Sequence, residues 1–139
     1  MGINQSICTS FKVELLRGIH DFTTDVFKLA LYGPAASLSA LTTTYTSTGE
    51  IAAVGAYTAG GVTLTPTLPS ADGTTAMLSF ANLSIAADLT AHGALIYNSS
   101  KADRSVLTLD FGGARSSISG VFPIVFPTAN AQSAIIRIG

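Results

Sequence analysis

The side chains that could carry out acid-base or metal chemistry are few and scattered. His20 stands beside Asp21, with Asp25 four residues further on, and this set could bind a cation. Three ligands at irregular spacing in a turn are weak evidence for a metal site, because known sites use more regular patterns. A histidine near the end of a helix, where the helix dipole favours a positive charge, is the better-supported interpretation. We therefore predict no metal ligands here.

The second histidine and the single cysteine also lack catalytic partners in the sequence. His92 lies in an apolar stretch and could act as a general base only with a nucleophile directed at it. No G-x-S-x-G or Cys-His pattern supplies one. We expect His92 to be a strand residue at a subunit contact. Cys8 cannot form an internal disulfide, and a buried, small apolar side chain is its expected role.

Neither the glycines nor the carboxylates match a cofactor or hydrolase motif. Residues 60–61 and 112–113 are Gly-Gly pairs, but neither carries the Lys-Ser/Thr signature of a phosphate-binding loop. Glu14 and Glu50, the only glutamates, suggest no glycoside-hydrolase pair. Three aspartates are spread too widely for a calcium loop: Asp88, Asp103 and Asp110. The sequence predicts a protein that is not an enzyme and has no catalytic, cofactor-binding or metal-binding residues.

Composition indicates protein partners instead of nucleic acid or membrane. The net charge is -1 and the seven Lys and Arg form no cluster, which argues against a nucleic-acid partner. No apolar run is long enough to span a bilayer, and no segment has the pattern of a signal peptide. Charged residues make up only 11% of the chain, against roughly 25% in ordinary soluble domains. We expect much of the surface to contact other protein; a monomer coated with Ser and Thr is the alternative.

The clearest structural signal is a β-hairpin around which the rest of the chain is expected to fold. Residues 91–97 and 105–111 are apolar, and the polar segment 98–104 joins them. Apolar side chains occupy both alternating positions of each strand. A half-exposed strand would alternate apolar and polar residues, so this hairpin is predicted to be covered on both faces.

A single helix is predicted at the front of the chain, over residues 6–17. Ile7, Phe11 and Leu15 repeat at intervals of four, Asn4 or Ser6 is placed to cap the start, and Gly18 to end the helix. The helix carries too few charged residues for all of its remaining surface to face water. We expect this helix to lie across a sheet or along a neighbouring molecule.

Short strands separated by Gly, Pro and Ser turns are predicted for the remainder. A strong strand at 26–32 is followed by a long excursion over 35–48, with a helical turn at 37–41. Further strands are expected at 50–57 (weak), 62–67, 75–80, 83–86, 121–126 and 134–138, with a flexible loop at 112–120. The predicted fold is mainly β, an antiparallel β-sandwich or jelly-roll-like barrel with one N-terminal α-helix. Residues 1–139 are predicted to form a single domain, with a helical segment at 1–20 and a β domain at 21–139.

The chain resembles, along nearly its whole length, virion structural proteins of tailed bacteriophages of similar size. The resemblance is carried by the segments ICTSFKVELLRGIHDF, FKLALY, YTAGGVTLT, HGALIYN and LTLDFGG and by the Phe-Pro-bearing end. Members of this group are described as head decoration or cement proteins, or as tail-fibre-associated proteins. No catalytic or cofactor residues belong to the pattern.

The resemblance implies a non-enzymatic virion protein, made in the cytoplasm of the host bacterium. As a cement or decoration protein it would bind the assembled capsid, with the major capsid protein as partner and a homo-oligomer as its own state. The excursion, the helix and the loops at 98–104 and 112–120 would then be contacts. The alternative is a tail or tail-fibre-associated protein that recognises host carbohydrate through exposed aromatics such as Tyr45 or Tyr57. A cell-wall hydrolase is a third hypothesis, with no acid-base pair to support it.

Overall fold

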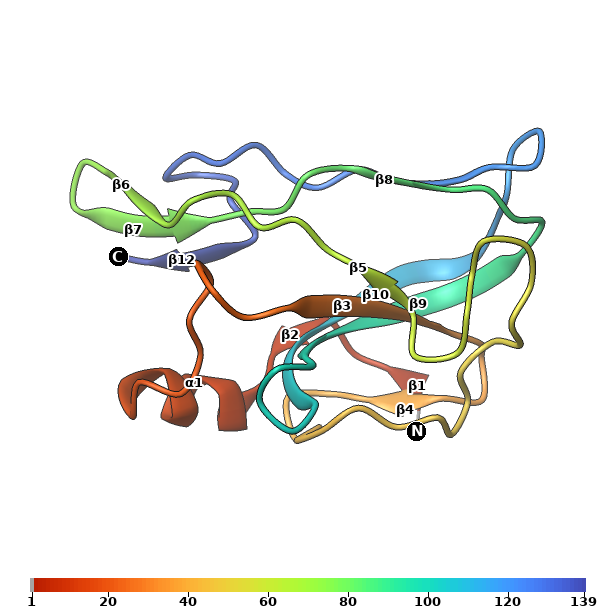
Figure 1. Cartoon of the computed structure of the whole chain (residues 1–139), viewed down its shortest axis with the longest axis horizontal. Coiled ribbons are helices and arrows are strands. Elements are labelled where there is room, and N and C mark those ends of the chain that lie inside the picture. The colour runs from red at the N-terminus through yellow and green to blue at the C-terminus, as the bar shows by residue number, and fades with distance from the viewer. Residues whose placement is uncertain (1) are drawn as a thin grey trace.

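The computed structural model describes residues 2–139, and its centre is a five-stranded antiparallel sheet (Figure 1). The strand order is β2-β10-β9-β3-β5. These strands are β2 (Ser6–Ile7), β10 (Arg104–Ser116), β9 (Thr90–Asn98), β3 (Phe27–Tyr32) and β5 (Val62–Thr63). Strands β9 and β10 form the predicted hairpin, and β3 pairs along the other side of β9.

Both faces of the central sheet are covered, as the hairpin sequence predicted. Leu29 and Ile96 point to one face and belong to the large core. Leu95 and Tyr32 point to the opposite face and form the small core with four other buried residues. The side chains named here, Leu29, Ile96, Leu95 and Tyr32, are 0% exposed. The continuous apolar runs therefore reflect burial on two sides.

Short sheets and one pair of parallel strands provide the two covering layers (Figure 1). The large core is closed by the sheet β12-β7-β6 and by the pair β8-β11. Their bounds are β6 (Ser70–Asp72), β7 (Thr75–Leu78), β8 (Leu83–Ile85), β11 (Phe122–Ile124) and β12 (Ile136–Ile138). The small core is closed by β1 (Gly2–Ile3) and β4 (Ser37–Leu38), which pair in parallel. The fold is mainly β and sandwich-like, and none of the sheets in residues 2–139 closes into the alternative barrel.

The helix α1 (Thr9–Leu16) is shorter than predicted at its start. Residues Ser6–Ile7 belong to β2, because their backbone pairs with β10 and they do not form the first helical turn. The N-cap is Cys8 in an extended conformation, with no side-chain cap, and neither Asn4 nor Ser6 serves this function. No helix in residues 2–139 has the length and apolar character needed to cross a membrane.

The end of α1 at Gly18 is confirmed. Gly18 has a φ of +72°, the left-handed conformation that glycine adopts at low cost. Its N–H donates to the Leu15 carbonyl at 3.1 Å, and the Ile19 N–H donates to the Glu14 carbonyl at 3.0 Å. This pair of bonds is a Schellman motif, which satisfies the last carbonyls of the helix.

Three local predictions were wrong. The helical turn at 37–41 is absent, because residues Ser37–Leu38 pair with β1 and a turn follows in which the Thr42 N–H donates to the Ser39 carbonyl. Residues 50–57 are not a strand and contribute only isolated bridges. The loop predicted at 112–120 begins as strand, since β10 continues to Ser116 through a register shift between Asp110 and Arg115. Glycines at 112 and 113 therefore build a bulge inside a strand.

Candidate functional site

His20 is the centre of a buried polar network. Its side chain is 0% exposed, and its Nε2 lies 2.8 Å from Glu14 Oε1. Its Nδ1 lies 3.0 Å from Asn98 Nδ2. The same Asn98 nitrogen donates to Asp25 Oδ2 at 2.8 Å, so the amide protons of Asn98 serve both neighbours. His20 Nδ1 is then the acceptor, and the Nε2–H group donates to the Glu14 carboxylate.

Asp21 and Asp25, the predicted neighbours of His20, lie in different environments. Asp25 joins the network and also accepts a bond from Lys101 Nζ at 2.7 Å. Asp21 is exposed and instead accepts from the Thr23 N–H and hydroxyl at 2.9 and 2.6 Å. No group of three or more His, Cys, Asp or Glu side chains able to hold a metal ion occurs in residues 2–139. The network ties the end of α1 to the tip of the β9–β10 hairpin.

The carboxyl of Asp25 should make stability depend on pH. Burial alone would raise its pKa, but bonds from Lys101, Asn98 and the Asp21 amide hold the pKa below its ordinary value. A lowered folded pKa contributes stability above the unfolded value, about 3.9, and that stability is lost as the pH falls through the folded pKa. Asp25→Asn should lower the free energy of unfolding at pH 7 by about 1–2 kcal/mol and flatten its decline in acid. Urea unfolding at a series of pH values measures both effects.

Asp88→Asn is the matched control for this prediction. Asp88 is exposed, unlike Asp25, and it lies outside the His20 network. The substitution should leave the pH dependence of unfolding close to that of the wild type. An identical response of the Asp25 and Asp88 variants would contradict the contribution assigned to the network.

The four tyrosines of the chain gather around Glu50 and the segment next to it. Tyr57 donates to Glu50 Oε2 at 2.6 Å, the Gly60 N–H donates to the same oxygen at 2.8 Å, and Tyr45 donates to Oε1. Tyr97 donates to the Gly60 carbonyl, and burial raises the pKa of Tyr97 to about 12. This cluster fastens the excursion and its continuation to the central sheet.

The expectation that Tyr45 or Tyr57 is an exposed carbohydrate platform was therefore wrong. Tyr57 is 0% exposed, and its hydroxyl also accepts a bond from the Leu31 N–H at 2.8 Å. Tyr45 is half-buried and stacks on Tyr97 with ring centroids 4.8 Å apart. Both aromatic rings pack inside the fold, because their hydroxyl groups donate hydrogen bonds to the Glu50 carboxylate.

The remaining candidate residues are dispersed over the structure. Cys8 is fully buried, as predicted, and burial raises the pKa of its thiol. His92 lies in β9, and its Nδ1 is buried without a hydrogen-bond partner among residues 2–139. Glu14 and Glu50 belong to the two separate networks described above. Asp110 lies in β10 and accepts a bond from the Gly112 N–H.

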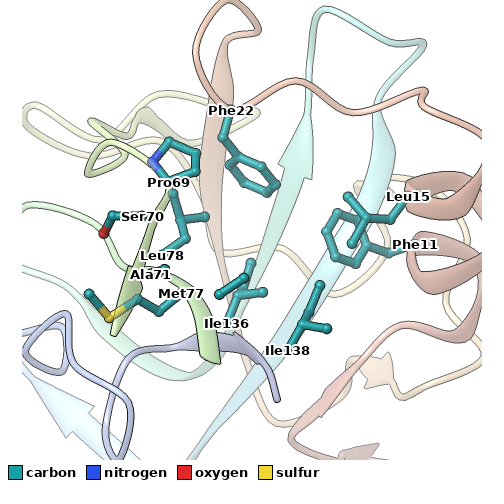
Figure 2. Close-up of a pocket in the computed structure, with 11 residues that line it drawn as sticks. Phe11, Leu15, Phe22, Pro69, Ser70, Ala71, Met77, Leu78, Ile136 and Ile138 are labelled. Atoms are coloured by element: carbon teal, nitrogen blue, oxygen red, sulfur yellow. The ribbon is translucent and has the colours of Figure 1, made fainter. Parts of the chain in front are cut away.

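An apolar groove lies between α1 and the sheet β12-β7-β6 (Figure 2). It has a volume of about 370 Å³. In Figure 2 the rings of Phe11 and Phe22 and the side chains of Ile136 and Ile138 border the same space. The other lining residues are Leu15, Pro69, Ser70, Ala71, Ala76, Met77 and Leu78. We call this hollow the α1–β12 groove.

The α1–β12 groove continues along the outer side of α1. An adjoining hollow of about 400 Å³ shares Phe11 and Ile136 with it and extends past Leu16. Leu16 is 91% exposed and Ile138 is 55% exposed. Two cations, Lys12 and Arg137, line this part, and no carboxylate side chain of residues 2–139 does.

The sequence pattern did not predict this groove, although one signal indicated it. The predicted apolar stripe of the helix left Leu16 outside, and β12 was recognised only as a terminal strand. The low charge of the helix was the available signal, because an amphipathic helix facing water normally carries more polar residues.

Comparison with protein-family models, with curated proteins and with solved structures found no match. Support for a function therefore comes from the residues, the fold and the surface described above.

Proposed function

We propose that this protein is a non-enzymatic structural component of a bacteriophage particle that binds the assembled capsid as a cement or decoration protein. The observation that carries the proposal is the apolar surface. Within residues 2–139 the exposed large apolar side chains are Val13, Leu16, Val26, Leu41, Leu68, Ile118, Val121, Val125 and Ile138. Such side chains favour contact with protein over water, and a chain with 11% charged residues has little else to keep them solvated.

The mechanism of a cement protein is thermodynamic. A protein that binds the closed shell more tightly than free subunits shifts the equilibrium toward the shell. The central sheet provides a rigid body for this purpose, because β3, β9 and the first half of β10 are mostly buried. The exposed apolar side chains lie instead on short strands, loops and α1. The major capsid protein is the proposed partner. A symmetric homo-oligomer on the shell is the proposed arrangement.

The predicted resemblance to virion proteins leads to the same proposal. The alternative, a tail or tail-fibre-associated protein, has lost one argument, because Tyr45 and Tyr57 are engaged with Glu50. The hydrolase hypothesis gains no supporting argument, because Glu14 and Glu50 lie in different networks. We therefore favour the capsid location.

The copy number of the chain in purified particles tests this function. We expect quantitative mass spectrometry to find it in amounts comparable with the major capsid protein, because a cement protein covers the whole shell. Tail proteins of known stoichiometry in the same particles are the internal standard. A copy number equal to that of a tail protein would overturn the capsid location and favour the tail alternative.

A further inference from the structure

Strand β12 presents an unpaired edge to the α1–β12 groove. It is the terminal strand of the sheet β12-β7-β6 and pairs only with β7. Figure 1 shows β12 between β7 and α1, and residues of both β12 and α1 line the hollow between them. The outer N–H and C=O groups of an edge strand can pair with another extended chain. The groove thus combines free backbone groups with an apolar lining.

The charges along the groove define the chemistry of its occupant. Lys12 lines the groove and forms no salt bridge within residues 2–139. Arg137 lines it too, and its guanidinium donates to the Gln132 carbonyl without a carboxylate partner in the same residues. An acidic group on the occupant would be attracted to both cations. A complementary partner is therefore apolar along its length and acidic beside α1.

We propose that the α1–β12 groove receives an extended segment of the capsid subunit as an additional strand beside β12. The segment pairs with the backbone of β12, and its apolar side chains pack between Ile138 and Leu16. An acidic residue of the segment lies near Lys12 and Arg137. This mode of binding is β-strand addition, in which the backbone provides affinity and side-chain pockets provide specificity. The inference rests on the proposed function, because that function supplies the capsid partner.

A second copy of this chain fits the groove less well than a capsid segment. Two-fold symmetry would pair β12 with the β12 of the other copy in antiparallel orientation. Arg137 is the middle residue of β12, so the two Arg137 side chains would lie opposite one another. Like charges directly opposite each other in a sheet are destabilising. The cations of the groove therefore favour a different, acidic chain.

The first experiment measures binding of the full chain to shells assembled without it. We expect the wild-type chain to co-sediment with such shells and Leu16→Glu to lose at least about tenfold in affinity, as central interface residues do. Val125→Glu is the matched control, because Val125 is 76% exposed and does not line the groove. Circular dichroism should show that both variants remain folded, since both side chains are exposed. Equal binding of the two variants would overturn the inference and leave the proposed function intact.

The second experiment detects strand pairing directly. Hydrogen exchange of the β12 amides should slow when the chain binds shells, because a new strand protects the outward N–H groups. An unchanged exchange rate at β12 in the bound state would overturn the inference. Sedimentation of the chain alone is also required. A dimer that Leu16→Glu dissociates would assign the groove to a second copy and overturn the capsid segment as its occupant.

A peptide probe separates failure of this inference from failure of the proposed function. The probe is the extended peptide acetyl-Glu-Glu-Val-Thr-Val-Thr-Val-amide, and its control replaces both Glu with Lys. We expect the acidic probe to slow exchange at β12 and to bind more tightly than the lysine control. Protection by the probe in a chain that does not bind shells would support strand addition and contradict the capsid function. Absence of protection by both shells and probe would overturn the inference.

Discussion

Leu95→Asp is expected to prevent the chain from folding. Leu95 is 0% exposed in the middle of β9 and packs with Ala30 and Tyr32 in the small core. An aspartate there would leave a carboxylate without a partner in an apolar environment, which costs more than about 4 kcal/mol. The total stability of a domain is only about 5–15 kcal/mol. We expect loss of soluble expression, or a circular dichroism spectrum without the native β signal.

Two further aspartate substitutions grade this effect. Leu109→Asp should be less damaging, because Leu109 is only partly buried at the border of the large core. Val125→Asp should fold normally, because Val125 is 76% exposed. The expected order of damage is therefore Leu95, then Leu109, then Val125. A Leu95→Asp protein as stable as Val125→Asp would show that the second face of the central sheet is not covered.

Gly61→Ala is expected to lower the free energy of unfolding by more than about 3 kcal/mol. Gly61 has a φ of +94°, and a Cβ at this position would lie 2.0 Å from the Leu29 carbonyl oxygen. The obstacle is the backbone of β3, which lies between β9 and β5 in the central sheet, so it cannot move aside without disturbing the sheet. Urea unfolding monitored by circular dichroism measures the loss.

Gly73→Ala isolates the cost of the backbone conformation from the cost of the clash. Gly73 has a φ of +64°, and a Cβ there would meet no atom within 4 Å. Its substitution should cost only about 1 kcal/mol, the penalty of a left-handed conformation for alanine. Equal losses for the two variants would contradict the close approach of Gly61 to β3.

The elements predictable from sequence are those whose pattern arises from burial alone. The hairpin of β9 and β10 and the strand β3 carry apolar residues on both alternating faces, a pattern typical of strands covered on two sides. The end of α1 at Gly18 was predictable because left-handed backbone selects glycine. Short strands and turns were expected in the regions that contain β6, β7, β8, β11 and β12. Only a few residues of each region form backbone hydrogen bonds with a neighbouring strand.

The features that escaped prediction depend on contacts between distant segments. Residues Ser6–Ile7 continue the helical period in sequence, and only the neighbouring β10 converts them into β2. Asn98 was assigned to a polar hairpin tip, although it is 0% exposed and bonded to His20 and Asp25. Glu50 carried no signal for the tyrosine cluster, because its partners Tyr45 and Tyr57 looked like surface aromatics.

The candidate site could not be predicted for the same physical reason. The α1–β12 groove brings Phe11, Phe22 and Ile136 together from both ends of the chain and the region after α1. Each of these residues has the character of ordinary core in the sequence. The exposed Leu16 and the unpaired edge of β12 become meaningful only when α1 and the sheet are placed opposite one another.

The thermal stability of capsid shells with and without this chain tests the central claim most directly. Shells assembled without the chain should be heated alone and after addition of the wild-type protein, and their disruption followed by light scattering. We predict that addition raises the disruption temperature and that the increase saturates when the binding sites on the shell are filled. No change in the disruption temperature at saturating concentrations of the chain would contradict a cement function.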